Sequence, residues 1–537
     1  MDLRPSRRRL GFGLVAAGLT LARGARCDAT AWGDWRRWGD QQDGYYRNPV
    51  LPADFSDIDV IGVGQDYYAI ASSMQLSPGM SVLHSRDLVN WATISHVVSD
   101  LTTLGPDYGW RMMGRYGRGV WAGAIRHHAG AFWVFFGTPD EGYFMSRAVA
   151  AVGPWSTPHP VLFQPGWDDC CPLWDDDGRA YLVGTHFADG YRTWMFPMSP
   201  DGREIDRSRA ALVNQGQGRE ANKLLKIGGR YFLLFSADID GVGRCVMARR
   251  AEAPMGPYGP ARQLAHDSPE ALEPNQGGLV ETPSGAWYFF THHGHGAWEG
   301  RAASLLPVSW RGGWPIIGTP QPDGMGAMAW GGRKPIRGRP VDYSHLDGFD
   351  APMLDMRWQW NHQPRDDHWS LTERPGWLRL RAWPALIPGD VMTAGDTISQ
   401  PSFRTAANSF TAKLDIGGMV DGQQAGLIHF SHAHARLAVL QSDGQRRIAW
   451  IDSATSEAGP RLAESQVWLR SQWGSDGQAR FAFSADGRAF RQLGPPYQMS
   501  FGDYRGDRIG LFTFNDRGDA GWVDIDWVDY EVGGGAP

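Results

Sequence analysis

Three short acidic segments contain the side chains best suited to chemistry. They are Ser56-Asp57-Ile58-Asp59-Val60, Trp167-Asp168-Asp169-Cys170-Cys171-Pro172 and Glu220-Ala221-Asn222-Lys223-Leu224. Each precedes a segment whose pattern predicts a β-strand, and they lie about 50 to 110 residues apart. Carboxylates that a rigid scaffold brings from separate strands to one face are what acid–base cleavage of a glycosidic bond requires.

The residues around these segments repeat a strand pattern. Stretches that combine aromatic with alternating apolar residues, typical of half-buried strands, begin at Tyr67, Phe132, Tyr181, Tyr231 and Trp287. A unit of about 50 residues with several short strands has the size of a propeller blade. We therefore predict a five-bladed β-propeller over residues 45–318, whose blades would gather the acidic segments on one axial face.

A second pattern begins near residue 346. Alternating stretches typical of strands begin at Trp369, Trp377, Phe410, Ala425, Ala479, Arg508 and Trp522. Many short strands at regular spacing predict a β-sandwich of the jelly-roll type over residues 346–535. Residues 319–345 are rich in Gly, Pro and Met and are interpreted as a linker that also packs on the propeller. The predicted fold class is all-β.

Composition excludes several functional classes. The 537 residues are 42% hydrophobic and 20% charged, as in globular proteins of two or more domains. A net charge of −6 with both signs interspersed gives no electrostatic basis for binding nucleic acid. The four cysteines form neither a disulfide framework nor a zinc-binding spacing. Most of the 26 tryptophans are expected in cores, and a few as platforms for sugar rings.

The N-terminus has the pattern of an export signal. Adjacent arginines, Arg7 to Arg9, precede an apolar stretch over residues 10–21, which is too short to span a bilayer. The arginine pair resembles a twin-arginine signal, with an ordinary Sec signal or an uncleaved anchor as the alternatives. We predict a signal peptide over residues 1–29, a periplasmic or extracellular protein, and no membrane contact after signal removal.

Several motifs in order resemble glycoside hydrolase family 43. They are Tyr46-Arg47-Asn48-Pro49-Val50-Leu51, Ser56-Asp57-Ile58-Asp59-Val60, Gly119-Val120-Trp121-Ala122, Trp167-Asp168-Asp169, Asp175-Asp176-Asp177-Gly178, Gln276-Gly277-Gly278-Leu279-Val280 and Gly300-Arg301. The C-terminal part is similar to the concanavalin-A-like domain fused to many members. That similarity rests on Trp358-Gln359-Trp360-Asn361-His362 and Trp369-Ser370-Leu371-Thr372-Glu373-Arg374-Pro375-Gly376.

The resemblance implies roles for individual residues. Asp57 matches the general base, Glu220 the general acid, and Asp169 the residue that orients the acid and modulates its pKa. Residues matched to or implied at the substrate site are Trp121, Arg301 and Asn275. From the residues alone, Asp59 competes with Asp57. Asp168 likewise competes with Asp169, because a shift of one residue in a strand reverses which side chain faces the axis.

Some positions depart from the family pattern. Ile58 follows the base where Pro is usual, Ala221-Asn222 follows the acid where Gly-Pro is usual, and Asn275 stands where His is common. Family members need no cofactor for the chemistry. A structural calcium stays open at two places: the propeller centre, where Asn offers one neutral carbonyl oxygen, and the last strand, with its acids Asp524, Asp526 and Asp529.

The resemblance implies an inverting, exo-acting glycosidase. Its substrates would be oligosaccharides from arabinose- or xylose-containing plant polysaccharides, with α-L-arabinofuranosidase and β-xylosidase both open. The alternatives are a propeller and lectin-like protein that binds glycan without cleaving it, and an endo-arabinanase. Nothing in the sequence determines the oligomeric state.

Overall fold

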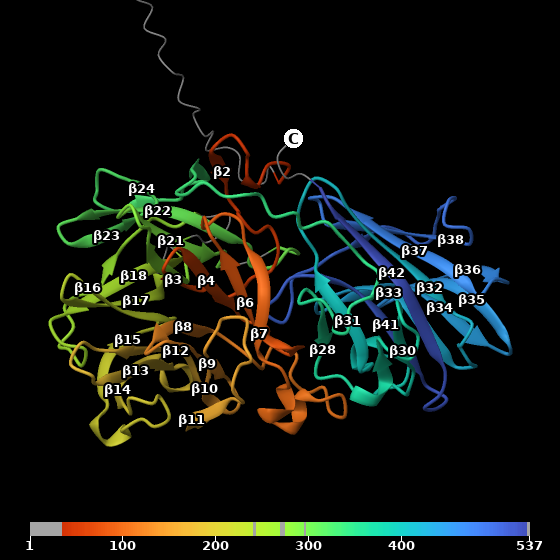
Figure 1. Ribbon diagram of the computed structural model, residues 1–537, viewed down its shortest axis with the longest axis horizontal. Coiled ribbons are helices and arrows are strands. Elements are labelled where there is room, and N and C mark those ends of the chain that lie inside the picture. The colour runs from red at the N-terminus through yellow and green to blue at the C-terminus, as the bar shows by residue number, and fades with distance from the viewer. Residues whose placement is uncertain (1–34, 240–242, 269–273, 295–296, 534–537) are drawn as a thin grey trace, which may run out of the picture.

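The computed structural model describes residues 35–239, 243–268, 274–294 and 297–533. Almost all of the regular structure in these ranges is β-strand, arranged in two bodies that lie side by side (Figure 1). The short 3-10 helices there are η1 (Leu101–Thr103), η2 (Pro106–Tyr108), η3 (Phe187–Asp189), η4 (Arg207–Arg209), η5 (Asp366–His368) and η6 (Val391–Thr393). None of the helices in the described part has the length and apolar character to cross a bilayer. The predicted signal peptide, residues 1–29, lies outside the described ranges.

Five four-stranded antiparallel sheets form the N-terminal body. Blade 1 contains β3 (Asp59–Val63), β4 (Asp66–Ala71), β6 (Gly79–Ser85) and β7 (Ala92–Val98). Blade 2 contains β8 (Gly123–His128), β9 (Ala131–Thr138), β10 (Gly142–Ala148) and β11 (His159–Phe163). Blade 3 contains β12 (Trp167–Trp174), β13 (Ala180–His186), β14 (Arg192–Met198) and β15 (Ala211–Gln215). Blade 4 contains β16 (Glu220–Ile227), β17 (Arg230–Ile239), β18 (Gly243–Ala251) and β19 (Arg262–Gln263). Blade 5 contains β20 (Gly277–Glu281), β21 (Trp287–His292), β22 (Ala303–Arg311) and β23 (Trp314–Ile317).

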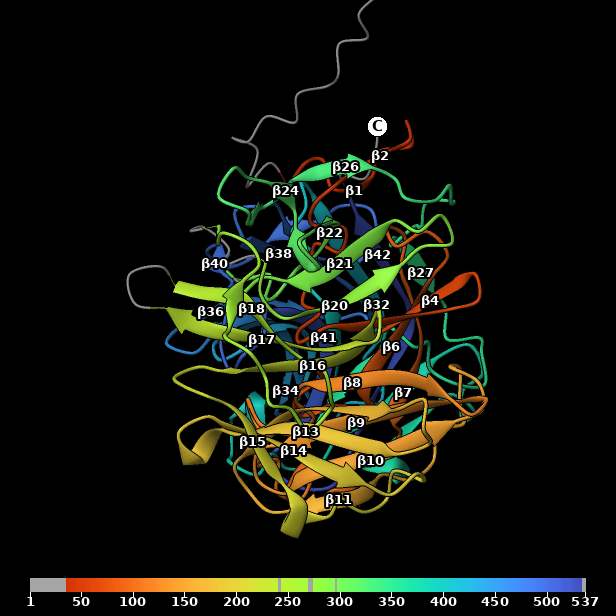
Figure 2. The same cartoon turned by 90° about the vertical axis from the view of Figure 1, so that its left-hand side faces the viewer.

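The blades close into a ring. The first strand of each blade contacts the first strand of the next, and β20 of blade 5 returns to β3 of blade 1. The predicted five-bladed propeller is therefore confirmed, and Figure 2 turns it toward the viewer. Each of the five aromatic stretches read from the sequence forms the second strand of a blade, namely β4, β9, β13, β17 and β21.

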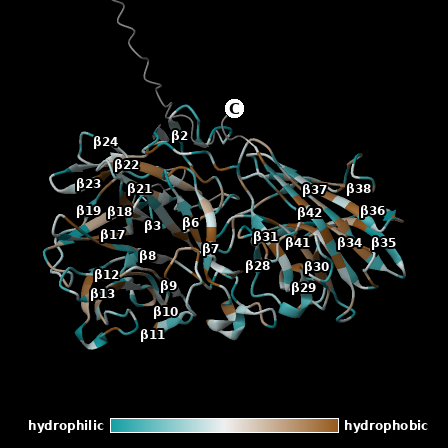
Figure 3. Ribbon diagram, in the orientation of Figure 1, coloured by the Kyte–Doolittle hydropathy of each residue, from teal (hydrophilic) through white to brown (hydrophobic). Residues whose placement is uncertain are grey.

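Apolar side chains between neighbouring blades build the propeller core. Val60 and Phe290 belong to a buried cluster shared by blades 1 and 5, and Trp91 stacks on Phe290 with ring centroids 4.7 Å apart. Similar clusters fill the other four blade interfaces. Figure 3 shows hydrophobic and hydrophilic residues interleaved along the strands, as expected when one face of a strand is buried.

The segment after the propeller packs on it. β24 (Thr319–Pro320) pairs with β25 (Gly326–Ala327), and β26 (Gly331–Arg333) joins β1 (Gly39–Asp40) and β2 (Tyr45–Arg47) in a three-stranded sheet. This sheet connects the described N-terminal segment to the chain that leaves blade 5.

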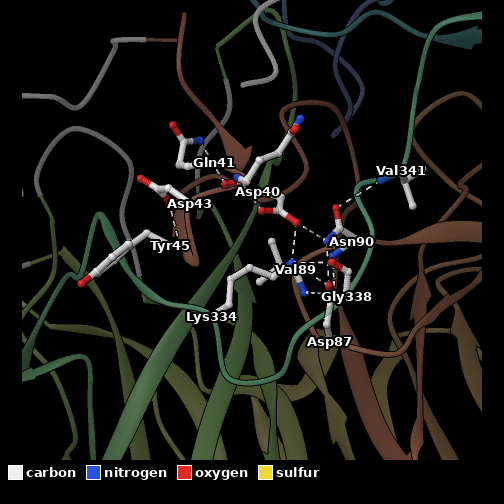
Figure 4. Close-up of polar contacts among 12 residues, drawn as sticks. Asp40, Gln41, Asp43, Tyr45, Asp87, Val89, Asn90, Lys334, Gly338 and Val341 are labelled. Carbon is white, nitrogen blue, oxygen red and sulfur yellow. Dashed lines mark hydrogen bonds and ion pairs between the residues drawn. The ribbon is translucent and has the colours of Figure 1, made fainter. Parts of the chain in front are cut away.

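A buried charge cluster connects the N-terminal segment, blade 1 and the segment after blade 5 (Figure 4). The Lys334 ammonium forms ion pairs with Asp40 and with Asp87, the latter at 3.0 Å. Asn90 Nδ2 donates to both carboxylates, at 2.9 Å and 2.7 Å. All four side chains are largely buried, so the lysine neutralises carboxylates from two distant parts of the chain.

The C-terminal body is a sandwich of two antiparallel sheets. The nine-stranded sheet contains β27 (His345–Asp347), β29 (Trp369–Ser370), β30 (Leu378–Arg381), β32 (Asn408–Asp415), β37 (Gln466–Trp473), β38 (Gln478–Ser484), β39 (Arg491–Gln492), β40 (Tyr497–Gln498) and β42 (Trp522–Val532). The eight-stranded sheet contains β28 (Gln359–Asn361), β31 (Asp396–Pro401), β33 (Gln423–Phe430), β34 (His434–Ser442), β35 (Gln445–Asp452), β36 (Ser456–Leu462), β41 (Arg508–Asn515) and β5 (Leu76–Ser77). The predicted sandwich is confirmed.

One strand of the sandwich comes from the propeller. β5 lies between β4 and β6 of blade 1 in sequence, yet it pairs with β28 through Ser77 opposite Trp360 and Leu76 opposite Asn361. The two bodies therefore share backbone hydrogen bonds across their boundary, which the sequence pattern did not predict.

Candidate active site

The six predicted site residues gather at one end of the propeller. Each blade contributes one residue at or near the start of its first strand: Asp57, Trp121, Asp169, Glu220 and Asn275. The sixth, Arg301, precedes β22 in blade 5. All six line one cavity of about 730 Å³, which we call the axial cavity.

The backbone is irregular where it presents the acids. Asp57, Asp169 and Ala221 have left-handed φ values of 57°, 53° and 64°. This conformation costs a residue with a Cβ atom on the order of 1 kcal/mol. Ala221 stands where the family usually has glycine, which adopts such a φ without that cost. The chain accepts local strain at each of the three acids.

A β-bulge brings both Asp168 and Asp169 to the axial cavity. We expected strict alternation to turn only one of them to the axis. The register of β12 shifts between Asp168 and Cys171, however, and both carboxylates line the axial cavity. Asp169 Oδ1 accepts a hydrogen bond from Gln276 Nε2 at 2.8 Å, and Asp168 Oδ1 accepts one from the Asp169 backbone N–H at 2.7 Å.

Asp59 forms an ion pair between two blades and does not line the axial cavity. Its Oδ2 accepts hydrogen bonds from Arg126 Nη1 at 2.7 Å and from the Ile125 backbone N–H at 2.9 Å, which ties blade 1 to blade 2. It is absent from the residues that line the axial cavity in the described chain, whereas Asp57 is among them.

A guanidinium and a neutral imidazole lie beside the Asp57 carboxylate, since burial lowers the pKa of His292 to about 3. Arg301 Nη1 donates to Asp57 Oδ1 at 2.8 Å, and His292 Nε2 lies 3.8 Å from the same oxygen. Burial raises the pKa of Asp57, but the Arg301 charge, helped by Ser72 and Lys223, outweighs it and brings the pKa below the usual aspartate value. Asp57 is therefore ionised at neutral pH and can accept a proton.

The pKa values of Asp168 and Asp169 are raised, whereas that of Asp57 is lowered. Burial, followed by the charge of Glu220, raises the pKa of Asp169 to about 7. Burial and the neighbouring Asp169 raise the pKa of Asp168 well above its usual value. Carboxyl groups this close cannot all ionise together, so this side of the cavity retains a proton near neutral pH.

Arg244 contacts Glu220, and sequence reasoning missed it. Its Nη2 forms an ion pair with Glu220 Oε1, and its Nε donates to Asn275 Oδ1 at 3.3 Å. Ser236 Oγ donates to the same amide oxygen at 2.6 Å. Asn275 thus lines the cavity and also holds Arg244 beside the acid. Alternation in β18, the strand two places from Glu220 in the blade, is the only sequence signal for it.

Aromatic rings form the wall around Trp121. Its indole Nε1 donates to Gly117 O at 3.1 Å, and its ring lies 6.0 Å from Phe187 and 5.8 Å from Tyr504, measured between centroids. Tyr504 and Phe501 belong to the sandwich, so the second body completes the cavity. No sequence pattern links residue 504 to residue 121.

The residues considered for calcium do not fit a cation. The Asn275 carbonyl oxygen already accepts from two donors. In the sandwich, Asp524 accepts from Arg374 and Arg379, and Asp526 pairs with Lys413. No group of three or more His, Cys, Asp or Glu side chains in the described ranges is arranged to hold a metal ion.

Comparison with known proteins identifies the family. The profile of glycosyl hydrolases family 43 matches residues 46–315, and that of the β-xylosidase C-terminal concanavalin-A-like domain matches residues 346–531. The chain belongs to glycosyl hydrolases family 43. It is a glycosidase whose second domain is the concanavalin-A-like sandwich of the family.

Two curated relatives and one solved structure illustrate the relationship. A β-xylosidase of Formosa agariphila is 33% identical over 93% of this chain and 92% of its own. A non-reducing end α-L-arabinofuranosidase of Bacteroides ovatus is 27% identical over 75% of this chain and 77% of its own. A family 43 hydrolase engineered to display both endo-xylanase and exo-arabinofuranosidase activity superposes with a TM-score of 0.80. The two sequences are 25% identical, and the superposition covers 91% of this chain and 100% of that one.

Proposed function

We propose that this family 43 enzyme removes terminal xylose or arabinose units from plant-derived oligosaccharides with inversion. The observation that carries the proposal is the electrostatic contrast within the axial cavity. Asp57 is held ionised by Arg301, while the opposite acids, Asp168 and Asp169, hold a proton near neutral pH. An inverting glycosidase needs an ionised base and a separate proton donor. Asp57 meets the first requirement, and the proton-holding Asp169 neighbours Glu220, the residue matched to the donor.

The proposed reaction is a single displacement. Asp57 accepts a proton from water, and the water oxygen bonds to the anomeric carbon. The bond between that carbon and the glycosidic oxygen breaks, and Glu220 donates its proton to the leaving oxygen. The products are a sugar of inverted configuration and a shortened glycan with a free hydroxyl. Arg301 orients the base, and Asp169 neighbours the acid.

The shape of the cavity supports cleavage at a chain end. The propeller floor carries the acids, and Tyr504 and Phe501 of the sandwich close one side. A walled cavity accommodates a terminal sugar, whereas cleavage within a chain needs an open groove. Rings such as Trp121 complement the apolar face of a pentose.

The decisive experiment measures release of p-nitrophenol from its α-L-arabinofuranoside and β-D-xyloside, with Asp57→Ala as the matched inactive variant. We expect turnover of at least one substrate by the wild type. NMR of the first-formed sugar should show the inverted anomer. No turnover of either glycoside, combined with cleavage of linear arabinan, would favour the endo-arabinanase. Glycan binding without any cleavage would favour a binding protein.

We also propose that the enzyme is exported. Support comes from residues 1–29, where Arg7 and Arg8 precede a short apolar stretch. The full chain should appear outside the cytoplasm in a bacterial host, and the double variant Arg7→Lys, Arg8→Lys should remain inside. Equal export of both forms would contradict a twin-arginine route.

A further inference from the structure

A second cavity, of about 310 Å³, lies where the propeller meets the sandwich. Its walls come from blade 1, from the segment after the propeller, and from β28, β31 and β41 of the sandwich. We call it the interface cavity. Nothing in the proposed reaction uses it, yet six of its polar side chains are more than nine-tenths buried: Ser73, His96, Gln359, Gln400, Arg505 and Arg508.

Arg508 reaches this cavity without an acidic partner. Its side chain is 3% exposed. Its Nε donates to Ser399 Oγ at 2.9 Å, and its Nη2 donates to Gln359 Oε1 and Ser399 O, both at 3.1 Å. All of these acceptors are neutral. A buried guanidinium that pairs only with neutral groups keeps a full uncompensated charge, which is costly.

Arg505 is equally buried, with 1% exposure. When the Gln75 amide is oriented to satisfy both of its ends, its oxygen accepts from Arg505 Nε at 3.2 Å and from Nη2 at 2.9 Å. Arg505 Nη1 is buried and has no hydrogen-bond partner among the described residues. Within that part of the chain, no carboxylate lies within 4.0 Å of either arginine.

The carboxylates that line the cavity or lie near its arginines are engaged elsewhere. Asp342 accepts from the Ser344 backbone N–H at 2.9 Å, and Asp355 accepts from Arg357 Nε at 2.7 Å. Asp54, which also lines the cavity, accepts at Oδ1 from the Arg301 backbone N–H at 2.9 Å. Asp507 accepts at Oδ1 from Ser402 Oγ at 2.8 Å and from His429 Nδ1 at 2.6 Å. They moderate the positive potential without pairing. Burial, and then the charge of Arg505, lower the pKa of Arg508 to about 9, which indicates incomplete compensation.

His96 adds an unpartnered polar group to the wall. It is 8% exposed, and its Nδ1 has no hydrogen-bond partner in the described chain. Burial and the nearby Arg508 lower its pKa to about 4, so the ring is neutral and can donate one N–H. The unsatisfied atoms of Arg505 and His96 call for a ligand with oxygen acceptors.

We propose that the interface cavity binds a small oxygen-rich anion, a carboxylate or a phosphate-like group, between Arg505, Arg508 and His96. The ligand would touch residues of both domains and bind only when they are docked. It would therefore stabilise the two-domain arrangement by mass action. The site does not depend on the assignment of the axial cavity.

The test is thermal unfolding of the full-length enzyme titrated with sodium phosphate and, separately, with sodium acetate. Ionic strength is held constant with sodium chloride. We expect a saturable rise of about 1–3 °C in the midpoint with one of the two anions. Non-specific salt effects rise without saturation and occur in any variant. The anion that saturates distinguishes a tetrahedral ligand from a planar one.

Two variants sharpen the test. Arg508→Gln should lose the saturable component, whereas Arg480→Gln, which removes an exposed arginine from the same domain, should keep it. Since Arg508→Gln risks misfolding, crystals of the wild type soaked in selenate give an independent measurement. Anomalous density beside Arg508 would support the site. A wild type without a saturable shift and without such density would overturn the proposal.

Discussion

The axial cavity and the interface cavity share a border, the sandwich segment 501–508, but carry different charges. Phe501 and Tyr504 face the axial cavity, which is dominated by carboxylates. Arg505 and Arg508 line the interface cavity, whose deeply buried charges are guanidinium groups. Carboxylates can gain and lose protons near neutral pH when burial shifts their pKa, and arginine cannot. Acids that can exchange protons thus line the axial cavity, and arginines of permanent charge line the interface cavity.

Replacement of Asp57, the proposed base in the axial cavity, should cause the largest loss of activity. We expect Asp57→Asn to lower kcat/KM by about 1,000-fold, because amides cannot accept the proton of the attacking water. Initial rates on the preferred p-nitrophenyl glycoside measure this. Asp43→Asn, at an exposed position between β1 and β2, is the matched control and should leave the rate unchanged. A loss of less than tenfold in Asp57→Asn would remove Asp57 as the base.

The buried charge cluster around Lys334 lies away from both cavities. We expect its charges to contribute to stability and not to activity. Lys334→Met leaves Asp40 and Asp87 buried without their cation. We expect a loss of about 3 kcal/mol in the free energy of unfolding with kcat unchanged. The control Arg230→Met breaks an exposed ion pair with Glu252 and should cost less than about 0.5 kcal/mol. Equal losses would refute a special role for the cluster.

The raised pKa of Asp169 predicts how stability depends on pH. Between pH 4 and about 7 the folded enzyme holds a proton that the unfolded chain has released, so stability falls as pH rises through this range. Asp169→Asn should therefore raise the free energy of unfolding by about 2 kcal/mol at pH 9 and leave it unchanged at pH 3. Denaturant titrations at both pH values measure this. A gain of the same size at both would contradict the assignment.

Asp396 extends the comparison to an acid outside both cavities. It is fully buried at the start of β31, and both oxygens lack partners among the described residues. Burial raises its pKa well above the usual value. Its contribution to stability is thus complete only below pH 4 and falls as pH rises. Asp396→Asn should stabilise the enzyme by about 1 kcal/mol at pH 8 without affecting kcat. Destabilisation at pH 8 would reveal a partner for the carboxylate.

The smallest effect should come from the shared segment. Tyr504→Ala removes a ring that packs on Trp121 but no charged group. We expect KM to rise roughly fivefold with little change in kcat, since stacking on a sugar or on Trp121 contributes about 1 kcal/mol. Tyr504→Phe, which keeps the ring, should restore most of the affinity. A large fall in kcat instead would mean that the sandwich shapes the reacting geometry itself.

Local patterns in the sequence were sufficient for the architecture. Aromatic and apolar stretches identified the second strand of every blade, from Tyr67 to Trp287, because most residues of these strands are buried between neighbouring blades. The same signal predicted the sandwich. The motifs led to six residues that the fold brings into one cavity. Five of them lie at or near the start of a first strand, and Arg301 precedes β22.

Contacts between distant segments were decided by the tertiary structure alone. β5 leaves blade 1 to extend a sandwich sheet, Arg244 pairs with Glu220 from another strand, and Tyr504 packs on Trp121 across the domain boundary. A residue's type and its neighbours in sequence carry no information about such partners. Burial has the same origin. One carboxylate stays ionised and another keeps its proton because folding determines which charges and how much water surround each.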